Sequence, residues 1–448
     1  MQKFEKNLTE GNVMKQLFSF SLPFLLSNFL QAMYGVTDTL IVSWFAGTHS
    51  VSGVANGGQI TLLITNFAVG FTAGGTVLIG QYFGANKREE LSKTIGTLLS
   101  LLCILAFTLT IIVVSFSGPI LRLIRIPEEA FIEAQRYLVI CALGTIFIFG
   151  YNAIASILRG MGDSKNPLYF VFIAGVINVF LDLLFVGPLG WGATGAAAAT
   201  IISQAVALIL IIIYLNKKGF IFEFKLQNFK INLAKFKLIF RIGFPSSIQN
   251  VIISFSFLLM TRLGNAFGVE ASAAMGVVGR FSGFAILPAL AMSSSVSSMV
   301  AQNLGAGKIN RAVKTLHVGL LLSVPIGLLF TLLAFFFPNA LIRIFTQDSV
   351  VIAKGVEYFR FIALDYVLAC IALCFTGLLM GAGQTTFTMC NSLVNSLLLR
   401  IPLAPFFALT LNMGLSGVGL AAPVATAGMI IVGFIYYKTG KWKQHVLV

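Results

Sequence analysis

Charged residues are scarce in this sequence. Only 10% of the 448 residues are Asp, Glu, Lys or Arg, whereas 57% are hydrophobic, and the mean hydropathy is +0.93. A soluble domain carries roughly a quarter charged residues, because its surface must be solvated by water. The shortage of charge therefore excludes an ordinary soluble fold and favours a chain that lies in the lipid bilayer.

Several motifs are also absent. No GxxxxGK[ST] loop occurs, which weighs against ATP as a driving force, and no TVGYG-like filter occurs, which weighs against a potassium channel. The three histidines are scattered singly, so a membrane-embedded enzyme with a His cluster is not favoured. Cys370 and Cys374 share a predicted helix face but have no His or carboxylate partner, so packing is a better interpretation than metal binding. We expect neither an enzyme nor a bound cofactor.

Long stretches without charge predict twelve transmembrane helices. About 20 apolar residues cross the hydrocarbon core, and backbone groups in lipid must be satisfied within each segment. The predicted spans are 15–45, 51–83, 92–117, 131–159, 166–187, 192–215, 236–264, 270–303, 312–337, 352–380, 385–410 and 415–437. The expected fold class is an all-α integral membrane protein with twelve helices in two pseudo-symmetric six-helix bundles.

The basic residues predict the orientation. With the N-terminus inside, 21 of the 30 Lys and Arg residues fall in cytoplasmic segments and seven in external ones. The positive-inside rule therefore places both termini in the cytoplasm of a multi-pass protein of the cell membrane. No signal peptide is expected. The net charge of +15 is spread over short loops, which indicates affinity for anionic membrane lipid instead of nucleic acid.

The sequence repeats itself weakly at half its length. Gln81–Lys87 matches Gln302–Lys308, and Leu158–Asp163 matches Leu379–Gln384, both at an offset of 221 residues. The expected domains are an N-terminal lobe (1–215), a basic cytoplasmic linker (216–235) and a C-terminal lobe (236–448). Two equal six-helix halves suit alternating access around a central cleft, so a secondary transporter is the favoured class.

Two acids lie deep in the first half. Asp38 is in the first predicted helix and Asp182 is in the fifth, where Asn178 shares its face. A charged group at the bilayer centre costs at least about 2.5–3.5 kcal/mol. Two neighbouring carboxylates cannot both be ionised cheaply there, unless a cation binds between them. The pair thus indicates H+ or Na+ chemistry, with a structural carboxylate at a helix kink as the alternative.

Other polar residues are weaker candidates. Thr200 and Asn152 would add oxygen atoms to a cation shell, or would form interhelical hydrogen bonds instead. The second half lacks the acid pair, since Leu259 stands at the repeat of Asp38. It offers a candidate polar site composed of three residues that could equally be structural or surface groups: Asp365, Arg280 and Arg400.

A series of segments, in this order along the chain, resembles the multidrug and toxic compound extrusion (MATE) transporters. They are Pro23, Val36–Val42 with Gly47, Ile79–Ala85, Arg159–Pro167, Asn178 with Leu181–Asp182, and Gly190–Gln204. The resemblance spans essentially the whole chain and is weaker in the second half. It implies twelve helices in a V of two lobes. It also implies export of lipophilic, often cationic, drugs and toxic compounds by antiport with Na+ or H+.

The resemblance implies roles for single residues. A cation-coupling group of prokaryotic members is matched by Asp38, Asn178, Asp182 and Thr200, with Asn152 nearby. Pro23 resembles the proline at which the first helix bends in some members, and is the expected hinge. Some relatives have acids in the seventh helix and deeper in the tenth. Here the seventh helix has none and Asp365 is about one turn away, so a second coupling site is not supported.

The remaining expectations concern partners and the closest alternative. The partners are small lipophilic substrates and membrane lipid, and the chain is expected to act as a monomer. No metal is expected beyond Na+. The alternative function is a lipid-linked oligosaccharide flippase of the same wider superfamily. Such a protein would gather several basic residues in its cleft to hold pyrophosphate, whereas only Arg280 and Arg400 are candidates here.

Overall fold

The computed structural model describes residues 5–124 and 126–444. All regular elements in this range are helices, so the predicted all-α fold is confirmed. Eleven helical spans are long and apolar enough to cross a membrane, and a pair of helices bent by 50° supplies a twelfth. Lys3 and Arg125, which enter the topology count, lie outside the described residues.

Seven α-helices make up the first half. They are α1 (Val13–Phe45), α2 (Gly47–Gly84), α3 (Arg88–Leu123), α4 (Glu128–Leu143), α5 (Thr145–Gly160), α6 (Lys165–Val186) and α7 (Gly192–Lys217). The sequence predicts one helix over 131–159, whereas the structure breaks it at Gly144. A Cβ atom at Gly144 would lie 2.2 Å from Ile201 Cδ1. The break therefore lies where α7 packs directly on the backbone, and only glycine allows this approach.

The second half has the same plan with more interruptions. Its helices are α8 (Leu233–Asn265), α9 (Val269–Ala285), α10 (Leu287–Gly305), α11 (Ile309–Phe336), α12 (Pro338–Arg343), α13 (Ser349–Ile362), α14 (Leu364–Gly381), α15 (Thr385–Leu393), α16 (Ile401–Pro405), α17 (Gly414–Thr439) and the 3-10 turn η4 (Lys441–Gln444). The predicted single helices 270–303 and 352–380 are broken at Ile286 and Ala363, and α12 was not predicted. The predicted helix 385–410 contains two π-helical segments, η2 (Val394–Arg400) and η3 (Phe406–Thr410).

The backbone supports the duplication seen in the sequence. Among the described residues, all those with positive φ except Gly11 form pairs one repeat apart. At an offset of 221 these are Gly47 with Gly268, Asn86 with Gly307, Gly162 with Gly383, and Gly219 with Gly440; at 222 they are Gly190 with Asn412 and Gly192 with Gly414. Positive φ is adopted readily by glycine and tolerated by asparagine. The turns between helices have thus kept their conformation where the helices have diverged.

The helices form two compact units that do not coincide with the two halves. The first unit contains Leu26–Ser247 with a short piece ending at Asn7, and the second contains Leu8–Leu25 with the chain from Ile248 onward. The predicted boundaries at 215 and 236 assign every helix whole to one lobe. In the structure α1 and α8 are instead each divided between the units.

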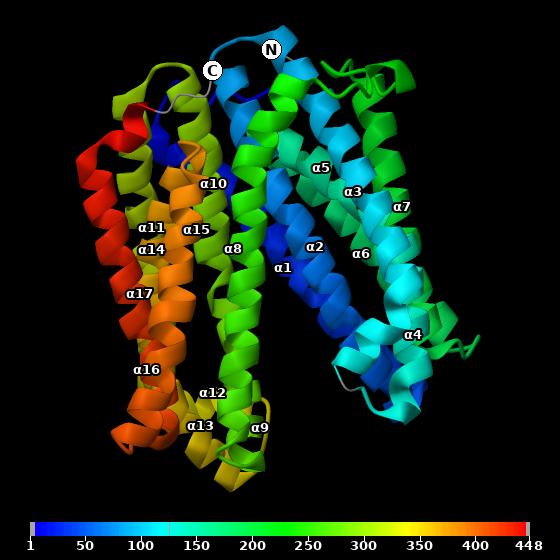
Figure 1. Ribbon diagram of the computed structural model, residues 1–448, viewed down its shortest axis with the longest axis vertical. Coiled ribbons are helices and arrows are strands. Elements are labelled where there is room, and N and C mark those ends of the chain that lie inside the picture. The colour runs from blue at the N-terminus through cyan, green and yellow to red at the C-terminus, as the bar shows by residue number, and fades with distance from the viewer. Residues whose placement is uncertain (1–4, 125, 445–448) are drawn as a thin grey trace. The chain divides into compact units, whose positions relative to one another are not determined.

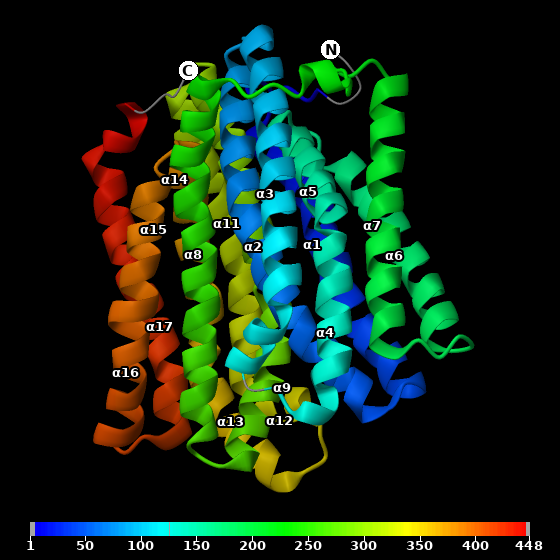
Figure 2. The same cartoon turned by 45° about the vertical axis from the view of Figure 1, so that its right-hand side comes forward.

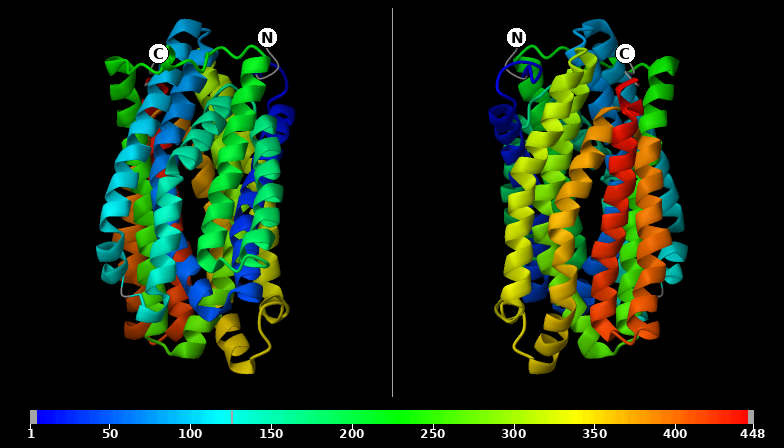
Figure 3. Two further views of the ribbon diagram at one scale, coloured as in Figure 1. Left: turned by 90° about the vertical axis from the view of Figure 1, so that its right-hand side faces the viewer. Right: turned by 90° about the vertical axis from the view of Figure 1, so that its left-hand side faces the viewer.

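Neighbouring helices in each unit pack along their length. In the first unit α6 and α7 lie side by side, and α2 packs on α4 and α5 (Figure 1, Figure 2). In the second unit α14 packs on α10 and α11, while α17 lies beside α16 and η2 (Figure 3). The buried residues of α7 are mostly small, and they include alanines at 0% exposure such as Ala196, Ala197 and Ala199. Small side chains let helices approach closely in a membrane, where van der Waals packing drives association.

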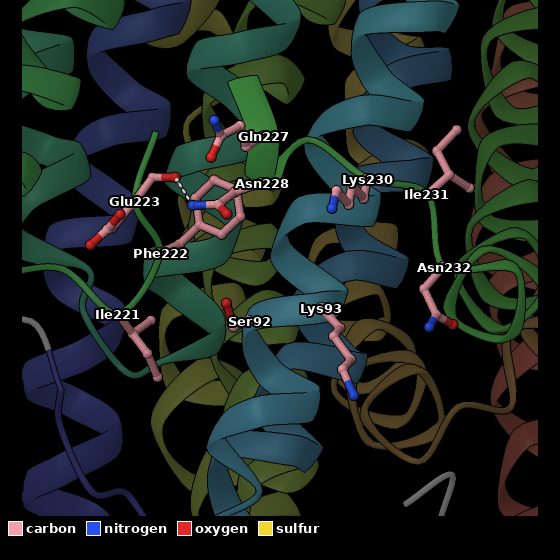
Figure 4. Close-up of a pocket in the computed structure, with 10 residues that line it drawn as sticks. All are labelled: Ser92, Lys93, Ile221, Phe222, Glu223, Gln227, Asn228, Lys230, Ile231 and Asn232. Atoms are coloured by element: carbon pink, nitrogen blue, oxygen red, sulfur yellow. Dashed lines mark hydrogen bonds between the residues drawn. The ribbon is translucent and has the colours of Figure 1, made fainter. Parts of the chain in front are cut away.

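The linker between α7 and α8 is fixed to the start of α3. It contains a short 3-10 turn, η1 (Leu226–Asn228), and Asn232 N donates to Thr97 Oγ1 at 3.1 Å. The Asn228 side chain donates to the Glu223 carbonyl at 2.9 Å, and both lie around a pocket of about 700 Å³ (Figure 4). The segment is therefore an ordered part of the first unit.

The turn after α5 explains one of the motifs in structural terms. Gly162 has φ +88°, and Asp163 accepts hydrogen bonds from the Lys165 and Asn166 amides at 2.9 and 3.1 Å. These amides open α6, so the acid caps that helix. Burial raises the pKa of Asp163, and the hydrogen bonds from Asn166 and Lys165 oppose the rise. This acid has a local structural role.

Candidate ion-coupling site

Four of the five residues predicted to form a cation-coupling group lie together in the first unit. Thr200 Oγ1 donates to Asp38 Oδ2 at 3.4 Å. Asp182 and Asn178 also lie within interaction distance of the Asp38 carboxyl. Asp38 is 8% exposed, Asn178 is 3% exposed and Asp182 is fully buried. Three helices, α1, α6 and α7, thus contribute to one buried cluster.

Most polar atoms of this cluster have no partner. Five of them are buried without a hydrogen bond: Asp38 Oδ1, both amide atoms of Asn178 and both carboxyl oxygens of Asp182. An unsatisfied buried polar group costs about 1–3 kcal/mol, and a charged one costs more. A proton shared by the carboxyls, or a small cation among the oxygens, would satisfy several of these atoms at once. The donor set therefore fits either ion.

Packing between α1 and α6 brings the two acids together. Gly175 lies where the Tyr34 ring crosses α6, and a Cβ there would be 2.4 Å from Tyr34 Cζ. The Tyr34 hydroxyl also donates a hydrogen bond to the Val171 carbonyl of α6. Asp38 is four residues after Tyr34, and Asn178 is three after Gly175, so each pair shares a helix face. The contact of Tyr34 with Gly175 fixes the register that aligns the polar residues.

A side chain at position 175 should separate the acids. We expect Gly175→Val to push the Tyr34 ring away and to reduce coupled export to the level of empty vesicles, while membrane insertion is retained. The matched control is Gly35→Val in α1, because a Cβ at Gly35 meets nothing within 4 Å. Transport by both variants in inside-out vesicles is the measurement. Full activity of Gly175→Val would show that the Tyr34 contact does not position the site.

The sequence did not single out two neighbours of the cluster. Tyr137 of α4 is 6% exposed, and the charges of both carboxyls act on its phenol. It lies against Gly57 of α2, where a Cβ would be 2.8 Å from its ring. Cys141, one turn further along α4, contacts Tyr137 and is fully buried in the same packing. The only signal available was the four-residue spacing of Tyr137 and Cys141, which is common in apolar helices.

The structure gives the local surroundings of the other predicted residues. Asn152 of α5 donates to the Ile148 carbonyl of its own helix at 2.8 Å. In the second unit Asp365 and Arg400 line one cavity, whereas Arg280 is exposed and does not line it. Pro23 is buried within an α1 that stays helical on both sides of it.

A duplicated bundle of membrane-spanning helices, with carboxyls buried inside one unit, defines the class of secondary membrane transporters. Comparison with known proteins places the chain within this class. The MatE family model matches residues 23–184 and 245–406. These two segments are one repeat apart and together include most of the chain. The chain belongs to the MatE family, so the resemblance to MATE transporters is confirmed.

Relatives and solved structures agree with this assignment. The probable multidrug resistance protein YpnP of Bacillus subtilis is 30% identical over 441 residues, covering 98% of this chain and 97% of the relative. The multidrug export protein MepA of Staphylococcus haemolyticus is 23% identical over 431 residues, covering 96% and 94%. A crystal structure of MATE in the bent conformation superimposes with a TM-score of 0.91 at 22% identity, covering 98% of both chains. The chain is a multi-pass membrane transporter.

Proposed function

We propose that the protein exports small lipophilic, often cationic, molecules by antiport with H+ or Na+ bound at Asp38, Asn178, Asp182 and Thr200. The five buried, unpartnered polar atoms of this cluster carry the proposal. They form an incomplete coordination shell. Binding of an ion satisfies these atoms and stabilises the cluster, and release of the ion leaves them unsatisfied again. The names of relatives, multidrug resistance and multidrug export proteins, support the substrate class.

The proximity of the two carboxyls favours a proton as the coupling ion. Asp38 and Asp182 lie near enough for the charge of one carboxyl to act on the other. Two carboxylates at this distance repel unless one of them is protonated, as in shared-proton carboxyl pairs. Sodium would use the side-chain oxygens of Asn178 and Thr200 as additional ligands. Both ions use the same residues, so the choice between them is a matter for experiment.

Inside-out membrane vesicles test the proposal directly. We expect ethidium, a lipophilic aromatic cation, to accumulate when the lumen is acidified or loaded with Na+, and the accumulation to collapse when that gradient is dissipated. Each gradient is imposed separately, so the effective one identifies the ion. Vesicles that contain the Asp38→Asn/Asp182→Asn protein are the control. Accumulation that neither gradient changes would contradict antiport.

The proposal also includes the membrane location, the orientation and the oligomeric state of the protein. The excess of basic residues in alternate loops supports a cytoplasmic location for both termini in the cell membrane. Each unit has its own buried core, which supports a monomer as the transporting species. The paucity of basic candidates beyond Arg280 and Arg400 makes a flippase for pyrophosphate-linked sugars the weaker alternative.

A further inference from the structure

The second unit contains a cavity of about 600 Å³ within its own helices. Side chains of α8, α9, α13, α14 and η2 line it, and they include soft apolar and aromatic groups: Phe257, Met260, Met275, Ile362 and Tyr366. Cavities of this size and lining are typical of sites for drug-sized molecules. Methionine adapts its shape to different ligands.

One wall of the cavity is backbone. Gly276, Gly279 and Gly283 follow one face of α9, and a Cβ at any of them would meet nothing within 4 Å. Glycine inside a helix costs about 1 kcal/mol relative to alanine, and a small-residue face usually lets another helix approach. Among the described residues, no neighbouring atom lies within 4 Å of these Cβ positions, and the three glycines are exposed. They leave open space along this side of the cavity, which the body of a ligand can occupy.

Two side chains of opposite charge, Asp365 and Arg400, line this apolar cavity without forming a salt bridge with each other. Asp365 Oδ1 and Arg400 Nε are both buried and have no hydrogen-bond partner. The guanidinium of Arg400 lies 5.0 Å from the centre of the Phe257 ring, and its charge acts on the Asp365 carboxyl. The side chains of both residues line the cavity, so its apolar lining is interrupted by one carboxylate and one guanidinium. Leaving both unsatisfied is costly.

The internal repeat shows how this cavity relates to the ion site. The offset grows from 221 at Gly162 to 222 at Gly190, so the second half has gained one residue between them. The π-helical segment η2 accommodates it, because a π-helical turn holds about one residue more than an α-helical turn. In this register Arg400 corresponds to Asn178, and Tyr358 of the cavity wall corresponds to Tyr137.

We propose that the second-unit cavity binds a zwitterionic amphipathic molecule, with its cationic group on Asp365 and its anionic group on Arg400. Its apolar body lies against the glycine face of α9. The repeat has thus produced an ion site in one unit and an organic-ligand site at the corresponding place in the other. This deepens the proposed export function by naming a substrate class, but binding itself requires no coupling ion.

Four fluorescent probes with one dansyl ring test the charge pattern on the purified full-length protein. Nε-dansyl-lysine has an ammonium and a carboxylate, dansylcadaverine has only an ammonium, dansyl-6-aminohexanoic acid has only a carboxylate, and dansyl propylamide has neither. We expect Nε-dansyl-lysine to bind at least tenfold more tightly than the other three, as measured by the blue shift and intensity of the dansyl emission.

Variants separate the cavity from unspecific binding. Gly279→Leu should weaken all four probes by at least tenfold while folding is retained, because position 279 has free space and leucine favours a helix. Asp365→Asn/Arg400→Gln should remove the preference for the zwitterion. Arg280→Gln, a change one residue from Gly279 at an exposed position, is the control and should change nothing.

Two results would overturn the proposal. One is equal affinity for the four probes, and the other is a preference for Nε-dansyl-lysine that survives Gly279→Leu. Asp38→Asn should bind the probes as the wild type does. A failure of ion coupling and a failure of this site are therefore distinguishable.

Discussion

Asp38→Asn and Asp182→Asn are each expected to reduce gradient-driven export to the level of vesicles without the protein. Asparagine has nearly the shape of aspartate but cannot take up and release a proton, and it provides no charge for a cation. The measurement is ethidium accumulation in inside-out vesicles under an imposed pH or Na+ gradient. Asp163→Asn is a matched control, because that acid caps α6 in a turn and is not part of the cluster.

Thermal stability distinguishes a coupling role from a structural one. Asp182 is fully buried, and both of its carboxyl oxygens lack a hydrogen-bond partner. If the acid is retained for coupling, its removal relieves an unfavourable burial, and the melting temperature of Asp182→Asn should be equal to or above that of the wild type. If the carboxylate holds a helix kink, the melting temperature should fall. Normal export with lowered stability would therefore reverse the assignment.

The sequence predicted the membrane class, the repeat and most of the buried polar cluster because these depend on scarce residues. Asp38 and Asp182 are conspicuous in helices that are otherwise apolar, and the four-residue spacing adds Asn178 directly. Their meeting across α1 and α6 depends on Tyr34 and Gly175, which no periodicity distinguishes from ordinary packing.

The helix breaks and the cavity could not be predicted from composition. A break at Gly144 and a π-helical segment ending at Arg400 depend on what packs against the backbone. Glycines at the spacing of those in α9 are usually typical of a face for close helix contact. Only the structure shows that, within the described part of the chain, no neighbouring atom lies within 4 Å of a Cβ at Gly276, Gly279 or Gly283. The division of α1 between two units is likewise a tertiary property.

The division of α1 between the two units lies close to Pro23, the predicted hinge. Pro23 lies two residues before the division of α1 between Leu25 and Leu26, and Pro245 lies two residues before the division of α8 between Ser247 and Ile248. Proline has no N–H to donate and crowds the carbonyl four residues earlier, so the helix is weakened there. Asp38 is fifteen residues after Pro23, about 22 Å along the helix axis.

We expect ion binding at Asp38 to bend α1 at Pro23, and Pro23→Ala to suppress this movement. Proline is about 3 kcal/mol less favourable than alanine inside a helix. If that whole difference favours the straight helix, the bent population falls roughly 100-fold, and export falls with it. Spin labels at Leu40→Cys in α1 and Phe180→Cys in α6, in a protein without native cysteines, report the distance within the first unit.

In the otherwise unchanged protein the label distance should shift across a pH or a Na+ titration. It should stay fixed in Pro23→Ala and in Asp38→Asn, since the first lacks the weak point and the second lacks the ion. Pro119→Ala is the control, because Pro119 also lies inside a helix but not at a division between the units.

A distance that neither ion changes would mean that α1 holds a static kink, tolerated because neighbouring groups satisfy the backbone. A shift that persists in Pro23→Ala would place the moving point elsewhere in α1. Bending at Pro23 is the coupling step only if both Pro23 and Asp38 are required for the same movement.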